Sequence, residues 1–259
     1  MSLPPTDEKG VRRPLISIII PCYNEAARLP ATLKSFDDFL AGNPTVLPLD
    51  QVELLIVDNN SNDGTRALAA EFARAHGYAR VITEARKGKG AAVRAGVLAG
   101  RGRWLMFCDA DSAMPFSELP KFLPPVRTNY DVAIGSREAQ GSVRYNEPAS
   151  RHLQGRLASW LTKMVLGLPF EDTQCGYKSF ERNAAQKIFA LQTIDGFGFD
   201  FEILYIARQL GYAVQEVPIN WYHQPGSTVR PVIDTIKVLN ELWKVRGNAR
   251  RRLYGARKN

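Results

Sequence analysis

The chain has few cysteines, no hydrophobic run long enough to cross a membrane, and no apolar core at its start. Cys22, Cys108 and Cys175 are its three cysteines in 259 residues, too few and too scattered for a disulfide framework or a zinc cluster. The longest apolar run, residues 15–20, has the length of a strand, whereas a membrane span needs ~18 apolar residues. The opening residues, MSLPPTDEK, lack the apolar centre of a signal peptide. We therefore expect a cytoplasmic protein, soluble or at most peripheral on a membrane.

The composition is that of a folded protein, with 45% hydrophobic and 23% charged residues. These proportions exclude a disordered chain, a collagen-like repeat and a coiled coil. The length allows one large α/β domain or two small ones.

Positive charge is concentrated at the C-terminus. Residues 230–259 hold nine Lys or Arg and two acidic residues, so they account for +7 of the net charge of +8. Just before most of these cations, apolar residues recur at helical spacing: Val232, Ile233, Ile236, Leu239, Leu242 and Trp243. This pattern suits an anionic membrane surface, and it equally suits a packed terminal helix with a solvated basic end. Nucleic-acid binding is not expected, because one short tail is a poor footprint for a duplex.

Short apolar runs alternate with helical patterns along the first half of the chain. We expect strands at 15–20, 52–57, 80–83, 104–108 and 131–135, and helices at 26–40, 65–76 and 89–99. This alternation predicts an α/β fold with a mostly parallel central sheet and helices on both faces. Farther on, we expect helices at 151–166 and 199–210 and a strand at 214–219. We divide the chain into an N-terminal tail (1–14), one domain (15–228) and a basic C-terminal helix and tail (229–259).

Polar residues follow each of the five expected strands, at 21–25, 58–65, 86–90, 109–111 and 136–137. In parallel sheets ligands bind beyond the carboxyl ends of the strands, so these segments predict a binding crevice.

Asp109-Ala110-Asp111 follows the fourth strand, and its two acids are two residues apart, so both carboxylates can point the same way past the strand end. Hard oxygen ligands at this spacing suit Mg²⁺ or Mn²⁺ shared with a diphosphate. The alternative is an ordinary helix N-cap made by one of the two acids. Lys87, Lys89 and the neighbouring glycines supply cations and close backbone approach for phosphate, although Ala91 rules out a phosphate loop of the Gly-Lys-Ser/Thr type.

The loops after the first two strands carry groups that suit a nucleoside. Asp58 ends a buried strand, where its carboxylate can accept a hydrogen bond from a base or ribose. Pro21 and Tyr23 can flank a base, while Glu25 fits either a ligand contact or the start of the next helix. For Asp63 we favour a turn-forming role.

Together these segments resemble glycosyltransferase family 2. The shared motifs are Pro21-x-Tyr-Asn-Glu, Asp58 with Asp-Gly-Thr, Lys-Gly-Lys-Gly and Asp-Ala-Asp. Asp172-Thr-Gln-Cys-Gly-Tyr-Lys, Phe199-Asp-Phe-Glu-Ile-Leu and Val217-Pro-Ile-Asn-Trp look like the dolichyl-phosphate β-glucosyltransferase branch. The resemblance spans residues 15–227. It implies an inverting, metal-dependent transferase with a single nucleotide-sugar-binding domain of the GT-A fold.

The resemblance also implies site residues. The donor would be bound by Pro21, Tyr23, Glu25, Asp58, Lys89, Asp109, Ala110 and Asp111. Asp109 and Asp111 would hold Mg²⁺ or Mn²⁺, with Asp111 the more direct ligand. Arg137 would bind the acceptor phosphate with help from Arg151, in keeping with the fit of guanidinium groups to phosphate oxygens. The alternative for Arg137 is a loop salt bridge, and for Asp172 a structural turn.

We expect a hexose, preferably glucose from UDP-glucose, to pass to a polyprenyl or dolichyl phosphate at the cytoplasmic membrane face. Ala113 stands where related mannosyltransferases have a metal-assisting Gln, which favours UDP over GDP. GDP-mannose or another donor remains an alternative. A second alternative is a hydroxyl acceptor, for which Asp172 would be the base. A binding module without catalysis is disfavoured because the acidic pair and Arg137 are intact, and a nucleotidyltransferase because no Gly-rich loop follows the first strand.

Overall fold

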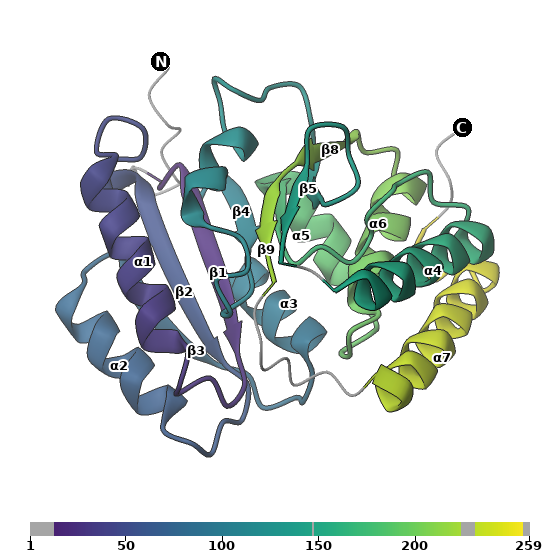
Figure 1. Ribbon diagram of the computed structural model, residues 1–259, viewed down its shortest axis with the longest axis horizontal. Helices are drawn as coiled ribbons and strands as arrows, with labels where there is room; N and C mark the ends of the chain where they lie inside the picture. The colour runs from purple at the N-terminus through teal and green to yellow at the C-terminus, as the bar shows by residue number, and fades with distance from the viewer. Residues whose placement is uncertain (1–12, 147, 224–230, 256–259) are drawn as a thin grey trace.

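The computed structural model describes residues 13–146, 148–223 and 231–255, and it is built around one seven-stranded sheet. The strand order is β3-β2-β1-β4-β7-β5-β8 (Figure 1). The strands are β1 (Ile16–Cys22), β2 (Val52–Asp58), β3 (Ala79–Thr83), β4 (Trp104–Phe107), β5 (Val132–Ser136), β7 (Lys178–Glu181) and β8 (Val214–Pro218). Two further strands, β6 (Val143–Tyr145) and β9 (Asn220–Tyr222), form a small parallel sheet.

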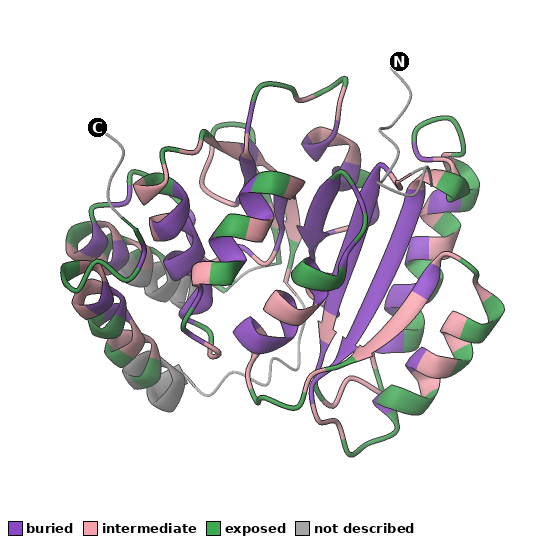
Figure 2. Cartoon of the chain, turned by 180° about the vertical axis from the view of Figure 1, so that it is seen from behind, coloured by how far each residue is buried: buried purple, intermediate pink, exposed green. Residues whose placement is uncertain are grey.

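Helices cover both faces of the sheet. They are α1 (Leu29–Gly42), α2 (Thr65–Ala75), α3 (Lys89–Ala99), α4 (Ala149–Leu166), α5 (Arg182–Leu191), α6 (Phe199–Gln209) and α7 (Pro231–Arg250). Two 3-10 helices, η1 (Leu49–Gln51) and η2 (Phe116–Phe122), complete the elements. The central strands are buried (Figure 2), as their near-continuous apolar sequences predict for strands covered on both faces.

The hydrophobic core has two parts, one on each face of the sheet. One part packs beneath α1, α2 and η2, with Phe36 and Phe122 fully buried in it. The other packs beneath α3, α5 and α6, with Phe189 and Phe201 fully buried. The sheet lies between these two apolar layers. Polar groups can therefore gather along its two edges, where the strands begin and where they end.

The expected α/β fold is confirmed, and each strand and helix predicted in the sequence is present with small shifts at its ends. The first helix begins three residues later than expected, at Leu29. Before it, the carbonyl of Glu25 accepts hydrogen bonds from the backbone N–H groups of Arg28 and Leu29, closing a turn. Pro30 then stands in the first turn of the helix, where its missing N–H leaves no bond unmade.

The sequence did not predict β7, which is antiparallel to its neighbours β4 and β5. Its four residues, KSFE, are too short and too polar to show a strand pattern. The strand has a large effect on the site: because it runs backwards, its first residue, Lys178, lies at the edge where the parallel strands end. Lys178 pairs with Phe107 of β4 and with Ile134 of β5.

The C-terminal helix α7 packs on the domain with one face only. Leu242 and Val245 are buried, and α7 contacts α4 and α6. On its outer face Trp243 is 61% exposed. The predicted helix is therefore confirmed as packed, yet it also presents an aromatic side chain to solvent. No helix within the described residues is long and apolar enough to cross a membrane.

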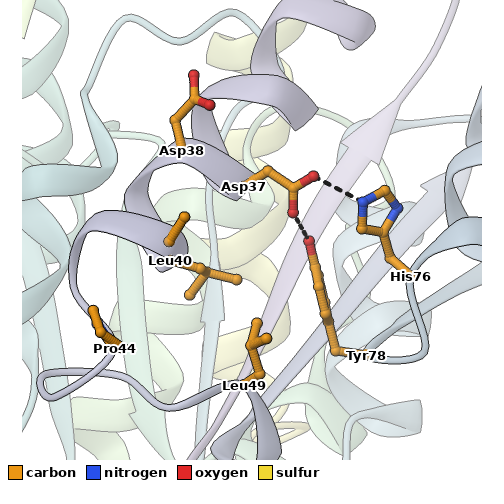
Figure 3. Close-up of a pocket in the computed structure, with 8 residues that line it drawn as sticks. Asp37, Asp38, Leu40, Pro44, Leu49, His76 and Tyr78 are labelled. Atoms are coloured by element: carbon orange, nitrogen blue, oxygen red, sulfur yellow. Dashed lines mark hydrogen bonds and ion pairs between the residues drawn. The ribbon is translucent and has the colours of Figure 1, made fainter.

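At the amino-terminal edge of the sheet, polar side chains are joined by a hydrogen bond and an ion pair. A pocket of about 370 Å³ lies there between α1, η1 and the start of β3 (Figure 3). On its wall, the Asp37 carboxylate accepts a hydrogen bond from the Tyr78 hydroxyl and lies 2.8 Å from Nε2 of His76. These three side chains therefore satisfy one another's polar groups.

Candidate functional site

The polar segments that the sequence predicts to bind a ligand gather at the carboxyl edge of the sheet. β1, β2, β4 and β5 all end at this edge, and the antiparallel β7 begins there. The polar segments after the strands therefore meet the segment 172–178 from the second half of the chain. The residues predicted to bind the donor lie here together with Arg137, one of the two predicted to bind the acceptor.

The loops after β1 and β2 are joined by hydrogen bonds. The backbone N–H of Asn24 donates to Oγ of Ser61 (3.0 Å), and that of Glu25 donates to Oγ1 of Thr65 (2.8 Å). The backbone N–H of Ala26 donates to the Asp63 carboxylate, which also accepts from the N–H and hydroxyl of Thr65. The expected turn-forming role of Asp63 is confirmed, and the two loops form one rigid wall.

This wall carries the residues expected to hold the nucleoside. Tyr23 is 56% exposed and available for stacking, and Pro21 is half-buried beside it. Glu25 is paired with Arg28 at 2.7 Å, and burial raises the pKa of Glu25 despite this pairing. Asp58 is fully buried and accepts hydrogen bonds from Arg66 (2.9 Å) and from the N–H of Ser61 (3.3 Å). The contact of Asp58 with a ligand stays a prediction.

The glycine-rich segment after β3 lies against the loop before α6. Gly88 has a φ of 134°, and a Cβ atom there would come 2.0 Å from the carbonyl oxygen of Asp195. Asn59 anchors this segment from the neighbouring loop: its amide group donates to the carbonyl of Arg86 (2.6 Å) and accepts from the N–H of Gly88 (2.8 Å). A larger residue at position 88 would push the segment away, so this glycine sets where Lys89 begins α3.

The acidic pair lies directly beyond β4. Asp109 contacts the ammonium group of Lys89, with 2.6 Å between Oδ1 and Nζ. Oδ1 of Asp111 accepts a hydrogen bond from the N–H of Ala113 (3.0 Å). Burial raises the pKa of Asp111, and the nearby Asp109 carboxylate raises it further. Ala110 between them is buried, and its carbonyl accepts a hydrogen bond from the hydroxyl of Thr32 (2.7 Å).

These two carboxylates fit part of a divalent-cation site. Both supply the hard oxygen atoms that Mg²⁺ and Mn²⁺ prefer, and their mutual repulsion would be relieved by a cation. The described part of the chain contains no group of three or more His, Cys, Asp or Glu residues that could hold a metal. The remaining ligands would therefore have to come from a bound diphosphate or from water.

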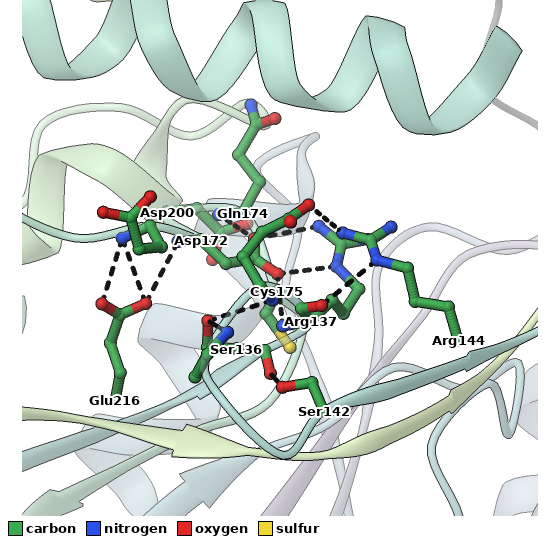
Figure 4. A network of polar contacts seen from close by, with 12 residues as sticks. Ser136, Arg137, Ser142, Arg144, Asp172, Gln174, Cys175, Asp200 and Glu216 are labelled. Atoms are coloured by element: carbon green, nitrogen blue, oxygen red, sulfur yellow. Dashed lines mark hydrogen bonds and ion pairs between the residues drawn. The ribbon is translucent and has the colours of Figure 1, made fainter. Parts of the chain in front are cut away.

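Arg137, which the resemblance assigns to the acceptor phosphate, forms a two-point ion pair with Asp172 (Figure 4). Its Nε lies 2.7 Å and its Nη2 2.9 Å from the two oxygens of that carboxylate, and its backbone N–H donates to Oδ2 (3.1 Å). The guanidinium also lies over the ring of Trp221, 5.7 Å from its centroid. Burial acts to raise the pKa of Asp172, but the charge and hydrogen bonds of Arg137 lower it to about 2.

Asp172 is itself held in place. It is buried, and its backbone N–H donates to the side chain of Glu216 (3.2 Å) on β8. The neighbouring N–H of Glu171 donates to the same carboxylate (3.0 Å). Arg137 is therefore aimed by a side chain that cannot easily move. Position 151 lies in α4, but the side chain of Arg151 is outside the described residues, so its role stays a prediction.

Three residues that organise the site were not predicted: Asn59, Gly176 and Lys178. A Cβ atom at Gly176 would come 1.9 Å from Oδ2 of Asp109, so only glycine lets this segment pass the acidic pair. Lys178 is fully buried, and its Nζ lies 2.5 Å from Oδ1 of Asp200 and 2.6 Å from the carbonyl of Cys175. The signal that could have found it is its place at the end of the motif Asp172-Thr-Gln-Cys-Gly-Tyr-Lys178.

Comparison with known proteins shows the family of this chain. The model of the family described as "Glycosyl transferase family 2" matches residues 17–189. The dolichyl-phosphate β-glucosyltransferase of Drosophila melanogaster is 32% identical over 89% of this chain and 74% of its own length. That of Homo sapiens is 30% identical over 89% and 74%.

Solved structures agree on the fold. Glucosyl-3-phosphoglycerate synthase from Mycobacterium tuberculosis, in complex with Mn²⁺, uridine diphosphate and glucosyl-3-phosphoglycerate, has a TM-score of 0.62 at 22% identity. The alignment covers 91% of this chain and 80% of that one. Mannosyl-3-phosphoglycerate synthase from Rubrobacter xylanophilus has a TM-score of 0.63 at 18% identity and covers 92% and 73%. The predicted GT-A fold and family resemblance are confirmed, and the chain belongs to glycosyltransferase family 2.

Proposed function

We propose that this glycosyltransferase moves glucose from UDP-glucose to the phosphate of a polyprenyl or dolichyl lipid, with inversion at the anomeric carbon. The observation that carries the proposal is Arg137, fixed by Asp172 at the same sheet edge as the acidic pair. The names of the relatives, which are dolichyl-phosphate β-glucosyltransferases, agree with this acceptor.

The donor would lie across the loops after β1, β2 and β4. Tyr23 and Pro21 would flank the uracil, and Asp58 and Glu25 would bind the nucleoside at the bottom of the crevice. Asp109 and Asp111 would hold a divalent cation, Mg²⁺ or Mn²⁺, which offsets the charge of the departing diphosphate. Lys89 lies against the same carboxylates and can meet the diphosphate as a second cation.

The acceptor side needs positioning more than proton transfer. A lipid phosphate is already an anion, so its oxygen can form the new bond to the anomeric carbon as the bond to the diphosphate breaks. Attack from the face opposite the leaving UDP inverts the configuration. Arg137 would hold the acceptor phosphate near this carbon, since a guanidinium group donates two parallel hydrogen bonds to phosphate oxygens.

The environment of Asp172 favours this acceptor over a hydroxyl. A hydroxyl nucleophile requires a base, and efficient bases have pKa values near the working pH. Asp172 is buried, bound through both oxygens to Arg137, and has a pKa of about 2. It is therefore suited to positioning Arg137 and poorly suited to accepting a proton.

The test is to incubate the purified protein with UDP-glucose or GDP-mannose and a polyprenyl phosphate, in the presence of Mg²⁺, Mn²⁺ or EDTA. We expect metal-dependent glucolipid from UDP-glucose. If only GDP-mannose gave product, the donor would be GDP-mannose and not UDP-glucose. Metal-dependent cleavage of the donor without any lipid product would overturn the lipid-phosphate acceptor.

Such an acceptor lies in a membrane, and we propose that α7, with α4 beside it, docks the protein on an anionic cytoplasmic surface. The two helices pack together (Figure 1). Trp160 and Met164, one turn apart on α4, are 55% and 66% exposed, and Trp243 is exposed on α7. Exposed cations, Arg156 on α4 and Lys244 on α7, accompany them. Exposed tryptophans with nearby cations are typical of surfaces that bind anionic lipids.

The docking is tested by sedimentation with phosphatidylcholine vesicles that contain or lack phosphatidylserine. We expect Trp243→Ala and Lys244→Glu each to weaken binding to the anionic vesicles at least about fivefold. Val126→Ala, which truncates an exposed apolar residue elsewhere, is the control. Unchanged binding of both α7 variants would contradict the proposal. Deletion of residues 246–259 is a poorer test, because it removes the buried Tyr254, whose hydroxyl donates to Glu202.

A further inference from the structure

Lys89 shares a carboxylate with the expected cation site. Its ammonium group lies 2.6 Å from Oδ1 of Asp109, and its side chain is only 19% exposed. Oδ2 of the same carboxylate faces the backbone at Gly176, where a Cβ atom would come within 1.9 Å. Both oxygens of Asp109 are thus approached by protein groups. A cation that binds Asp109 would have the Lys89 ammonium group beside its ligand.

Lys89 places one positive charge directly beside Asp109. Burial acts to lower the pKa of this lysine, but Asp109 and Asp200 hold it well above its ordinary value. Asp200 forms a buried pair with Lys178, and this pair is neutral as a unit.

The local charges balance differently with and without a diphosphate. Asp109 and Asp111 carry two negative charges, of which Lys89 offsets one, and the adjacent Glu25–Arg28 pair adds no net charge. A divalent cation would leave the cluster with an excess positive charge in a partly buried place, where charge interactions are stronger than in water. A diphosphate would remove this excess by binding both the cation and the ammonium group.

We propose that Lys89 makes divalent-cation binding at Asp109 and Asp111 dependent on the nucleotide. The lysine holds down the affinity of the acidic pair for the cation alone, and the diphosphate reverses this effect when it binds. By linkage, the cation strengthens nucleotide binding by the same factor. The inference deepens the proposed function and rests on it for the identity of the diphosphate ligand.

The test is a titration of the full-length protein with Mn²⁺, followed by electron paramagnetic resonance, with and without UDP. Lys89→Met removes the charge but keeps the length of the side chain. Lys34→Met is the matched control, since Lys34 is an exposed lysine on α1 whose ammonium group lies 2.6 Å from the Asp38 carboxylate.

In the wild type we expect UDP to raise the affinity for Mn²⁺ by about tenfold or more. Without UDP, Lys89→Met should bind Mn²⁺ on the order of tenfold more tightly than the wild type, and the enhancement by UDP should largely disappear. Lys34→Met should change the affinity without UDP by less than about threefold.

Equal Mn²⁺ affinities of the two variants without UDP would overturn the inference. So would a wild type whose Mn²⁺ affinity is the same with and without UDP, provided that UDP binds. Failure of UDP to bind any form would count against the proposed donor instead, while the titration without nucleotide would still report on Lys89. Lys89→Gln is the second variant, and thermal unfolding checks that each variant is folded.

Discussion

The two edges of the sheet both carry buried or half-buried charges, yet they use them differently. At the amino edge, the buried Glu53 accepts hydrogen bonds from the hydroxyl of Ser17 (2.5 Å), from Arg80 (2.7 Å) and from Arg101 (2.8 Å). At the carboxyl edge, Asp109 contacts Lys89 but keeps 37% of its side chain exposed. Asp111 there has a raised pKa, because it is buried beside another carboxylate.

The difference separates charges that stabilise the fold from charges that can bind a ligand. Burial acts to raise the pKa of Glu53, but hydrogen bonds from Ser17, Arg101 and Arg80 hold it below its usual range. A carboxylate whose negative charge is already stabilised by this many protein hydrogen bonds gains little from binding a cation. At the other edge, the negative charge of Asp109 and Asp111 is offset only in part, by Lys89. A cation could therefore bind the two carboxylates, and a diphosphate could bind the cation and Lys89.

The largest effect should come from Asp111→Asn. Losing a carboxylate ligand of the cation removes several kcal/mol of charge stabilisation, so we expect kcat to fall by about 10³-fold. The melting temperature should stay within about 2 °C, since Asp111 repels its neighbour Asp109. Initial rates and thermal unfolding measure the two quantities. Asp38→Asn, on the exposed face of α1, is the control, and a comparable loss of rate there would refute the assignment.

At the amino edge we expect the opposite result: a substitution should lower stability and leave catalysis almost unchanged. Glu53→Gln leaves Arg80 and Arg101 without their counter-charge, and we expect the free energy of unfolding to fall by about 3 kcal/mol. Catalysis should change by less than about twofold, because the residue is remote from the site. Urea unfolding and steady-state kinetics test both halves. A variant as stable as the wild type would show that this network does not stabilise the fold.

The pH dependence of stability should report the Asp172–Arg137 pair. The folded-state pKa of Asp172 is lowered from 3.8 to about 2, so this group stabilises the fold above the unfolded value and loses the effect as pH falls from about 4 to about 2. The contribution at neutral pH is about 2 kcal/mol. We expect the stability difference between wild type and Asp172→Asn to shrink over this range. A difference that stays constant with pH would argue against an ionised pair.

A smaller effect is expected from Arg137→Lys, which keeps the charge but loses the planar fork. The value of kcat/KM for the lipid phosphate should fall about tenfold, while the affinity for UDP stays unchanged. The matched variant is Arg80→Lys, which alters an arginine that binds a carboxylate at the opposite edge. If the two substitutions lowered kcat/KM equally, the loss would reflect stability and not acceptor binding.

Much of the site could be predicted because its residues belong to short sequence patterns. The continuous apolar strands, the glycines around Lys89 and the acids after β4 are all short-range patterns. They correctly predicted that these glycines and acids meet at one sheet edge. The segment 172–178 was different. Its motif was visible, but its position depends on a four-residue antiparallel strand whose pairing partners, β4 and β5, lie more than 40 residues earlier in the chain.

The sequence by itself determined the fold class, the family and the chemical types of the binding groups, since these follow from local periodicity and from motifs of contiguous residues. Only the tertiary structure decided how those groups are paired. It showed Asp172 bound to Arg137, Lys89 in contact with Asp109, and Lys178 buried against Asp200. Such pairings join residues 20 to 35 positions apart, and their energies depend on burial and on distances that a linear pattern does not contain.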